Sequence, residues 1–273
     1  MKKHSLCGTN GIDDLSAGEA MTFQSIEGTE RTEVLVGSTL QDTMFGQGDA
    51  DVFYGGYQVD FIFGKAGSDQ IFGGNGNDFL YGGRHDDGIM GGEGADIIYG
   101  GTGNDILLGG EGFDTIFGNK GDDILEGGDD SDILHGGRHA DELYGNNDSD
   151  ALFGGAGTDL IDGGAGVDVL TGGGGADVFV FSNASHSAAA SGDIVTDFVA
   201  GVDHIDFTSI GILNWIDNAD FTGSAGEFRW VQVGANTLLQ IDLDGDGLMG
   251  TGDVEVGLVG VAGIFETDVY FIG

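Results

Sequence analysis

The chain has 273 residues, a formal net charge of −39 at pH 7, 57 glycines and no proline. Average usage would give about 19 glycines and about 14 prolines, and a collagen helix is excluded because it needs abundant proline. Acidic disorder is disfavoured, since 40% of the residues are hydrophobic and 10% are aromatic. With 47 acidic and 8 basic residues, the chain would be repelled by nucleic acid and anionic membranes, so we expect a cationic partner.

Residues 1–36 are predicted to form an N-terminal cap. The basic opening Met1–His4 is not followed by an apolar segment, so we expect no cleaved Sec signal peptide. No run of about 18 apolar residues occurs, which predicts that nothing spans a membrane. The single Cys7 excludes an internal disulfide framework. A decayed repeat, Gly28–Val36, carries Glu33 where the later copies have aspartate.

Residues 37–180 are sixteen consecutive windows of nine residues, without insertion or deletion. Glycine stands at the first place, aspartate at the sixth and an apolar residue at the eighth place of all sixteen windows. Seven windows match GGxGxD completely. Self-similarity at a fixed short period is the signature of a solenoid, in which each copy is stabilised by stacking on its neighbours.

Each window is predicted to form a six-residue turn and a three-residue strand, with the eighth side chain inward and the seventh and ninth outward. Two windows per coil of 18 residues would give two parallel sheets enclosing a row of Ile, Leu, Met and Phe. The absence of proline fits, because every strand amide is needed by the next coil. Several fourth places without glycine carry Asp or His, which predicts a left-handed backbone there. These residues are Asp49, His85, Asp130, His139 and Asp148.

The sixteen sixth-place aspartates would form two columns of eight, with neighbours one strand spacing apart and strongly repulsive. Calcium resolves this repulsion, because it takes six to eight oxygen ligands from carboxylates and backbone carbonyls. Seven gaps in each column allow up to about fourteen ions. Magnesium is disfavoured by its need for near-octahedral geometry, and a metal-free solenoid capped by acids is the alternative.

The predicted calcium ligands lie in the repeat turns, and windows near 37–63 and 127–150, which lack several glycines, are expected to bind more weakly. The predicted aspartates are Asp60, Asp69, Asp78, Asp87, Asp96, Asp105, Asp114, Asp123, Asp132, Asp141, Asp159, Asp168 and Asp177. The glycines predicted to take part with them are Gly74, Gly76, Gly92, Gly94, Gly101, Gly103, Gly110, Gly112, Gly155, Gly157, Gly164, Gly166, Gly173 and Gly175.

The pattern GGxGxDxUx, in which U is apolar, resembles the RTX (haemolysin-type) calcium-binding repeat family. The resemblance covers more than half of the chain. It implies a parallel β-roll that is disordered without calcium and folds after export into calcium-rich surroundings. It also implies type I secretion, directed by an uncleaved C-terminal signal.

Residues 181–273 are predicted to form a C-terminal β domain. Phe179–Phe181, Gly192–Phe198 and Gly201–Phe207 resemble the C-terminal domain of serralysin-type proteases, and a similar block occurs in the calcium-binding modules of secreted alginate epimerases. Short alternating strands here would cap the last coil, or the block would be a separate binding module. The ending Glu266–Gly273 is similar to the family's export tail, although it ends in glycine.

A second metal motif is predicted near the C-terminus. Asp242, Asp244, Asp246 and Asp253 have the spacing of an EF-hand loop, with Asp instead of Glu at the twelfth position. The preceding Leu238–Ile241 is strand-like, which argues against the entering helix of an EF-hand. An isolated calcium loop and a simple acidic turn both remain open.

No catalytic motif was found. The sequence has neither HExxH nor GxSxG, so serralysin protease chemistry does not carry over and a lipase is disfavoured. His135 and His139 are four residues apart but fall in successive windows, not on one helix face. We therefore expect a protein that is not an enzyme.

One sheet is expected to present an aromatic outer face, which either forms a self-stacking ladder or is covered by residues 1–36, by the C-terminal block or by a second copy. Its ninth-place residues are Phe45, Phe63, Tyr81, Tyr99, Phe117, His135 and Phe153. The leading hypothesis is a secreted calcium-binding β-roll without catalytic activity. The alternatives are a polysaccharide-binding or adhesion module, and an accessory module of a separately encoded secreted hydrolase or epimerase.

Overall fold

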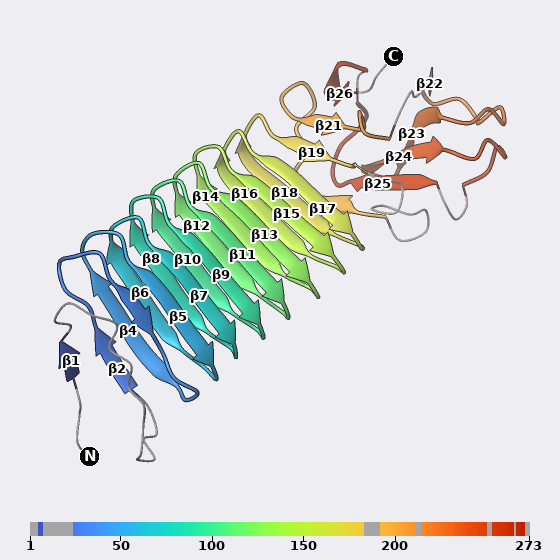
Figure 1. The fold of residues 1–273 in the computed structure, drawn as a ribbon. Coiled ribbons are helices and arrows are strands. Elements are labelled where there is room, and N and C mark those ends of the chain that lie inside the picture. Colours follow the sequence, from blue (N-terminus) through green and yellow to red (C-terminus); the bar gives the residue numbers. More distant parts are fainter. Residues whose placement is uncertain are drawn as a thin grey trace. The chain divides into compact units, whose positions relative to one another are not determined.

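The computed structural model describes residues 5–7, 24–182, 192–210, 214–249, 253–264 and 266–270. The chain divides into two compact units, Met1–Asp129 and Asp130–Gly273, which are described one at a time. In the described residues all regular structure is β, apart from the 3-10 turn η2 (Glu266–Asp268) (Figure 1). The all-β class is therefore confirmed. The described part of the chain contains no helix with the length and apolar character of a membrane span.

The first unit is a parallel β-roll. Its strands are β1 (Ser5–Cys7), β2 (Gln24–Glu27), β3 (Val34–Val36), β4 (Asp42–Gln47), β5 (Val52–Tyr57), β6 (Phe61–Ala66), β7 (Gln70–Asn75), β8 (Phe79–Arg84), β9 (Gly88–Glu93), β10 (Ile97–Thr102), β11 (Ile106–Glu111), β12 (Thr115–Lys120) and β13 (Ile124–Asp129). One sheet has the order β1-β2-β4-β6-β8-β10-β12, and the other β3-β5-β7-β9-β11-β13. Ile98 pairs with Leu80 and Ile116, so two windows form one coil, as predicted.

The strands are longer than predicted. Each repeat strand from β5 to β13 has six residues, because it continues through the first three places of the next window; β4 also has six, from the sixth place to the second place of the next window. In β10, Gly101 pairs in register with Gly83 on one side and Asn119 on the other. A β-carbon on Gly101 would lie 2.3 Å from the carbonyl oxygen of Gly83. The glycines therefore prolong the ladder, because without side chains their backbones can approach closely.

The core lies between the two sheets and consists of the eighth-place side chains. In the first unit these residues are at most 1% exposed; they are Met44, Phe53, Ile62, Ile71, Leu80, Ile89, Ile98, Leu107, Ile116 and Leu125. The seventh and ninth places point outward, as Ile106 with 51% exposure illustrates. The predicted inward and outward pattern is confirmed.

Truncating an inward eighth-place side chain should destabilise the roll more than truncating an outward seventh-place side chain. We expect Leu107→Ala to lower the free energy of unfolding by about 2–5 kcal/mol, because it leaves a cavity between two close-packed sheets. Its neighbour Ile106 is half exposed, so Ile106→Ala should cost about 1 kcal/mol or less. Urea unfolding of the full chain in saturating calcium measures both, and equal losses would contradict this assignment of the core.

The turns keep a left-handed backbone even where glycine is absent. At the fourth place, φ is +59° at Asp49 and +77° at His85, which confirms the prediction for that place. The second place has the same property, with φ of +78° at Lys65 and +75° at Asn119. The path of the turn is therefore preserved in windows whose glycines have been lost.

The second unit begins with a parallel roll of the same kind and continues into a different β arrangement. Its strands are β14 (Ile133–Arg138), β15 (Glu142–Asn147), β16 (Ala151–Gly157), β17 (Leu160–Ala165), β18 (Val169–Gly175), β19 (Val178–Val180), β20 (Ile194–Val195), β21 (His204–Asp206), β22 (Asn214–Trp215), β23 (Glu227–Val233), β24 (Asn236–Asp242), β25 (Val254–Leu258) and β26 (Val269–Tyr270). Its sheets have the orders β14-β16-β18-β20-β25-β24-β23-β22 and β15-β17-β19-β21-β26.

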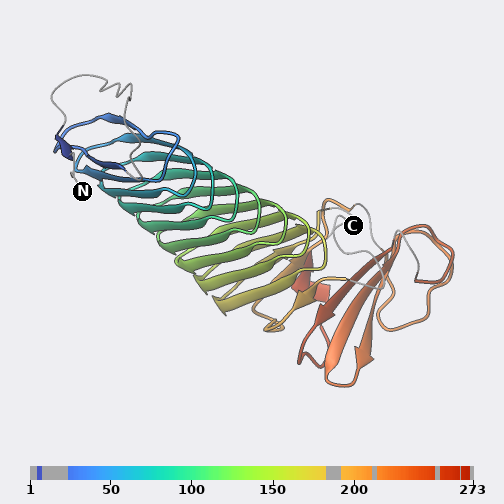
Figure 2. The ribbon, with the colours of Figure 1, turned by 90° about the horizontal axis from the view of Figure 1, so that it is seen from below.

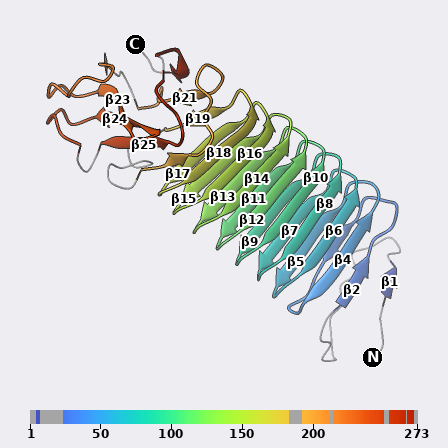
Figure 3. The ribbon, with the colours of Figure 1, turned by 180° about the vertical axis from the view of Figure 1, so that it is seen from behind.

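The C-terminal strands extend the sheets of the second unit. β20 and β21 join β18 and β19 in parallel, whereas β23, β24 and β25 pair antiparallel. Figure 2 shows the repeat strands of each unit as stacked rungs joined by turns, and Figure 3 shows them from behind. The predicted boundaries at 36/37 and 180/181 stay predictions. Parts of the predicted cap, of the loop after Asp242 and of the export tail lie outside the described residues.

Candidate metal centre

The sixth-place aspartates lie just before the strands and are buried. All sixteen, from Asp42 to Asp177, are at most 3% exposed. In most of them the carboxylate is held through one oxygen by the preceding coil. The backbone amide of Asp87 donates to Oδ1 of Asp105 at 2.8 Å, and that of Asp60 donates to Oδ1 of Asp78 at 2.7 Å. The two predicted columns therefore exist in each unit, built by hydrogen bonds between residues 18 apart.

The second carboxylate oxygen is the unusual atom. In several column residues of both units this second oxygen, Oδ2, is buried and accepts no hydrogen bond. This holds for Oδ2 of Asp51, Asp60, Asp69, Asp78, Asp87, Asp96, Asp105, Asp150 and Asp159. Burying a carboxylate oxygen without a partner is costly, and a buried charge is normally paired or coordinated to a metal. The columns thus require either protons or cations.

Backbone carbonyls line the same turns. A β-carbon on Gly74 would lie 2.3 Å from the oxygen of Gly56, and one on Gly76 would lie 2.1 Å from the oxygen of Gln58. The carbonyls of the second and fourth places therefore face the same places of the next coil. At these two glycines a side chain would occupy the space between the coils.

Carboxylate and carbonyl oxygens meet on one side of these turns. A β-carbon on Gly157 would lie 1.6 Å from the oxygen of His139 and 3.0 Å from Oδ1 of Asp159. At Gly166 the corresponding distances are 1.9 Å to the oxygen of Asp148 and 3.1 Å to Oδ1 of Asp168. These two turns therefore bring carboxylate and carbonyl oxygens together, the donor type that calcium prefers.

Burial also shifts the acidity of the columns. Desolvation raises the pKa of Asp87 to about 8, although the amide of Asp69 lowers it, and neighbouring carboxylates raise it further. The pKa of Asp96 and that of Asp105 rise to about 7 for the same leading reason. At neutral pH the columns are therefore only partly ionised unless positive charge is supplied.

The predicted ligands fit a calcium site. The first unit brings Asp60, Asp78, Asp96 and Asp114 into one column and Asp69, Asp87, Asp105 and Asp123 into the other; the second unit aligns Asp132 with Asp168, and Asp141 with Asp159 and Asp177. The predicted glycines supply the close turns: Gly74, Gly76, Gly92, Gly94, Gly101, Gly103, Gly110, Gly112, Gly155, Gly157, Gly164, Gly166, Gly173 and Gly175. Ion binding by individual residues stays a proposal.

The structure adds two aspartates that the repeat count did not include. Oδ1 of Asp193 accepts the amide of Asp168 at 2.9 Å, and Oδ1 of Asp203 accepts the amide of Asp177 at 3.0 Å. Both are at most 4% exposed. The spacings are 25 and 26 residues instead of 18, which hid them from a strict period. A sequence signal for both was present, since Asp193 and Asp203 each directly precede a short alternating strand, as the repeat aspartates do.

Two further repeat aspartates, Asp51 and Asp150, share this geometry although their windows have lost glycines. Asp42 is also buried, but its Oδ2 accepts the amide of Ser38 in its own turn at 2.6 Å. The decayed copy also takes part, since Glu33 accepts the amide of Thr29 at 2.6 Å and donates its own amide to Asp51 at 2.8 Å. The carboxylate position is therefore preserved in the degenerate windows, where weaker binding stays a prediction.

The second predicted motif is brought together only in part. Carboxylate oxygens of Asp242, Asp244 and Asp246 lie within 4.8 Å of one another. Asp242 accepts hydrogen bonds from two glycine amides of its own loop at 2.7 and 2.9 Å, and Asp253 accepts the amide of Leu243. The loop is entered from strand β24, so a helical EF-hand is absent. These bonds describe an acidic turn, and calcium binding there stays a prediction.

The aromatic face of the first unit stacks on itself. Ring centroids of Phe45 and Phe63 are 5.1 Å apart, and those of Tyr99 and Phe117 are 4.8 Å apart, with nearly parallel planes. Tyr81 is tilted against Tyr99 at 6.3 Å. The predicted self-stacking is confirmed for these pairs. A covering partner stays a prediction.

Neutralising one column aspartate should weaken calcium binding more than neutralising an exposed neighbour. Asp105→Asn keeps the acceptor for the amide of Asp87 but removes a charged ligand, so the calcium concentration for half-folding should rise about tenfold, or about 1.4 kcal/mol. Asp86→Asn removes the same charge at an exposed residue, whose Oδ1 accepts the amide of Asn104. Calcium titration followed by circular dichroism compares them, and equal midpoints would contradict the assignment.

Two protein-family models match the chain. Residues 56–271 match the model of the peptidase M10 serralysin C-terminal family, and residues 27–62 match that of the RTX calcium-binding nonapeptide repeat (4 copies). No curated protein shows significant similarity.

Among solved structures, the chain is similar to two subunits of the Azotobacter vinelandii mannuronan C5-epimerase. The AlgE6R3 subunit is 31% identical over 51% of this chain and 77% of that chain, with a TM-score of 0.41. The AlgE6R2 subunit is 27% identical over 64% of this chain and 91% of that chain, with a TM-score of 0.35.

Proposed function

The chain belongs to the peptidase M10 serralysin C-terminal family and carries RTX calcium-binding repeats, and from this we propose that it is a secreted, non-enzymatic protein that folds when it binds calcium outside the cell. The observation that carries the proposal is the pair of buried aspartate columns, in which Oδ2 of residues such as Asp78, Asp87 and Asp105 is buried and accepts no hydrogen bond. Calcium, when bound, supplies the positive charge that these columns lack.

The columns couple binding to folding. In the unfolded chain the aspartates are separate, hydrated and free to ionise, whereas the folded roll places them one strand spacing apart and out of water. A column residue such as Asp105 then orients Oδ1 toward the amide of the preceding coil and leaves Oδ2 for a cation. Folding without cations is therefore opposed by the same residues that favour it with them.

Coupled folding suits a protein that leaves the cell before it folds. A calcium-poor interior would keep the chain extended, and calcium-rich surroundings would drive the roll to form. We propose that export follows the type I route, with the signal in the C-terminal residues and without cleavage. Support comes from the match to the serralysin C-terminal family, which reaches residue 271.

Export can be tested in a bacterium that carries a type I exporter with broad substrate range. The full chain should appear in the medium with its complete mass, while a chain that ends after Ile264 should stay in the cells. Cell lysis is monitored with a cytosolic marker. Retention of the full chain, or a shortened secreted product, would contradict the proposed route without affecting the calcium-binding part of the proposal.

A further inference from the structure

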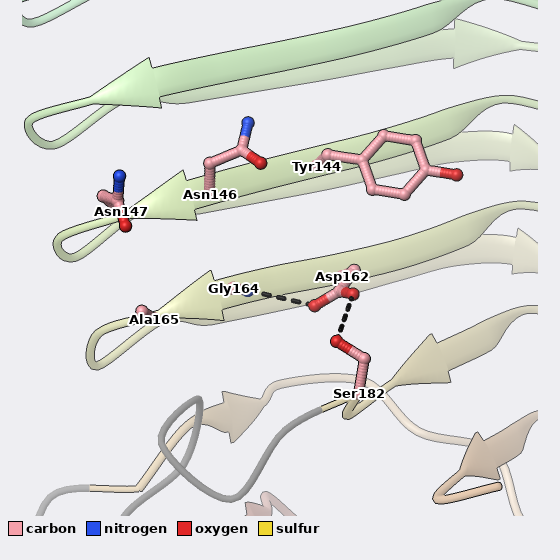
Figure 4. A pocket seen from close by; sticks show the side chains of 7 residues that line it. All are labelled: Tyr144, Asn146, Asn147, Asp162, Gly164, Ala165 and Ser182. Carbon is pink, nitrogen blue, oxygen red and sulfur yellow. Dashed lines mark hydrogen bonds between the residues drawn. The ribbon is translucent and has the colours of Figure 1, made fainter. Parts of the chain in front are cut away.

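The second unit contains a polar hollow on the outer face of the sheet that includes β15, β17 and β19. Its volume is about 330 Å³, at the lower end of the range of roughly 300–1,000 Å³ for small-molecule sites. Figure 4 shows the residues that line it. They are Tyr144, Asn146, Asn147, Asp162, Gly164, Ala165 and Ser182.

The coil brings the two central side chains together. Tyr144 and Asp162 are paired in register on the neighbouring strands β15 and β17. Both stand at the outward ninth place of their windows, and Ser182 follows the next strand of the same sheet. Residues that are distant in sequence thus form one surface, as Figure 4 shows.

The polar groups are held in place by the protein itself. Oδ1 of Asp162 accepts the amide of Gly164 at 3.1 Å, and Oδ2 accepts the hydroxyl of Ser182 at 3.2 Å. The hydroxyl of Tyr144 donates to Oε2 of Glu142 at 2.9 Å. An aromatic ring and a carboxylate are therefore oriented in advance, which reduces the entropy lost on binding.

Asn146 stands at the second place, where most windows have glycine, and Asn147 follows it at the variable third place. Asn146 occupies a second place with φ of +78°, a conformation that glycine adopts with less strain. The register partners of Asn146 and Asn147 are Gly164 and Ala165, so space is left beside the two amides. The window departs from the repeat in a way that adds hydrogen-bonding groups at the rim of the hollow.

The chemistry of the lining narrows the class of ligand. Asp162, with Glu142 nearby, would repel an anion, and the lining is too polar for a hydrocarbon ligand. One lining carboxylate is a poor charge complement for a divalent cation. Sugar hydroxyls can donate to the carboxylate and accept from the amides, and the C–H face of a sugar ring can lie against tyrosine. We propose that this hollow binds a neutral saccharide, a function separate from calcium-driven folding.

The proposal is tested with the full chain in saturating calcium on an array of neutral and uronate-containing glycans, followed by calorimetry with the best neutral oligosaccharide. Tyr144→Ala and Asp162→Asn should each weaken binding at least about tenfold, the loss expected for one strong contact. Tyr81→Ala is the matched control, since Tyr81 is an outward ninth-place tyrosine with 37% exposure in the first unit. It should bind as the unchanged chain does.

The calcium concentration for half-folding, measured by circular dichroism, is the control for correct folding. Neither hollow variant should change it. Binding to no neutral glycan, binding to uronates alone, or wild-type affinity in either hollow variant would overturn the proposal. Loss of affinity in Tyr81→Ala alone would place the ligand on the aromatic ladder of the first unit and would also overturn it. A neutral glycan lost in both hollow variants and kept in the control supports it.

Discussion

Removing calcium with EGTA at pH 7.5 should abolish the β-sheet circular dichroism of the chain, and an excess of calcium should restore it. The formal net charge is −39, and the folded roll buries its sixth-place aspartates at 3% exposure or less. Without cations, folding would have to desolvate these carboxylates and place like charges one strand spacing apart. This cost acts on every coil, so we expect the loss of the whole roll and not a local opening.

The control separates specific binding from screening. Sodium chloride at the same ionic strength weakens the repulsion between exposed charges. It does not provide a divalent ion that coordinates the buried carboxylate oxygens, so it should restore little structure. Magnesium should also be a poor substitute, because it requires near-octahedral coordination and keeps its water. A chain that stays fully folded in EGTA at pH 7.5 would refute calcium-driven folding.

Acidification should partly replace calcium. Burial raises the pKa of Asp78 to about 6, of Asp60 to about 7 and of Asp87 to about 8, from an unfolded value near 4. Because the folded-state pKa is the higher one, the folded form binds more protons. The calcium-free roll is therefore most stable below the unfolded pKa, and this stability is lost as pH rises through about 6 to 8.

The same protons compete with calcium. Ligand carboxylates must be ionised to bind the metal, so the calcium concentration for half-folding should fall as pH rises from 5.5 to 8. Circular dichroism in EGTA across this range, and calcium titrations at both ends, measure the two opposite trends. A calcium midpoint independent of pH, or a calcium-free chain that gains structure as pH rises, would contradict the buried columns.

Much of the site could be predicted because it repeats at a constant period. A sixth-place aspartate such as Asp105 and an eighth-place core residue such as Leu107 recur every nine residues, and a solenoid places equivalent residues one above the other. Local geometry followed as well, since His85 at a fourth place adopts the left-handed backbone that its position predicted. The length of the strands was not predicted correctly, because the hydrogen-bonded ladder continues through glycines that were assigned to the turns.

The remainder depended on contacts whose sequence separation varies. Asp193 and Asp203 join the columns across 25 and 26 residues, and only strand pairing shows that they occupy the same place as the repeat aspartates. The nature of the Asp242 loop was likewise left open by spacing alone. Its own glycine amides already satisfy Asp242.

The nine-residue period and the charge of −39 were enough to predict the coil of two windows, the inward apolar row and the need for a cation, because they leave few other structures. Which carboxylate oxygens are buried without a hydrogen bond, and which side chains meet across irregular spacings, could be seen only in the folded chain. Tyr144 and Asp162 are 18 residues apart and meet as the period predicts, whereas Ser182 reaches Asp162 across 20 residues. Such a juxtaposition depends on how the chain folds back on itself, which local patterns do not encode.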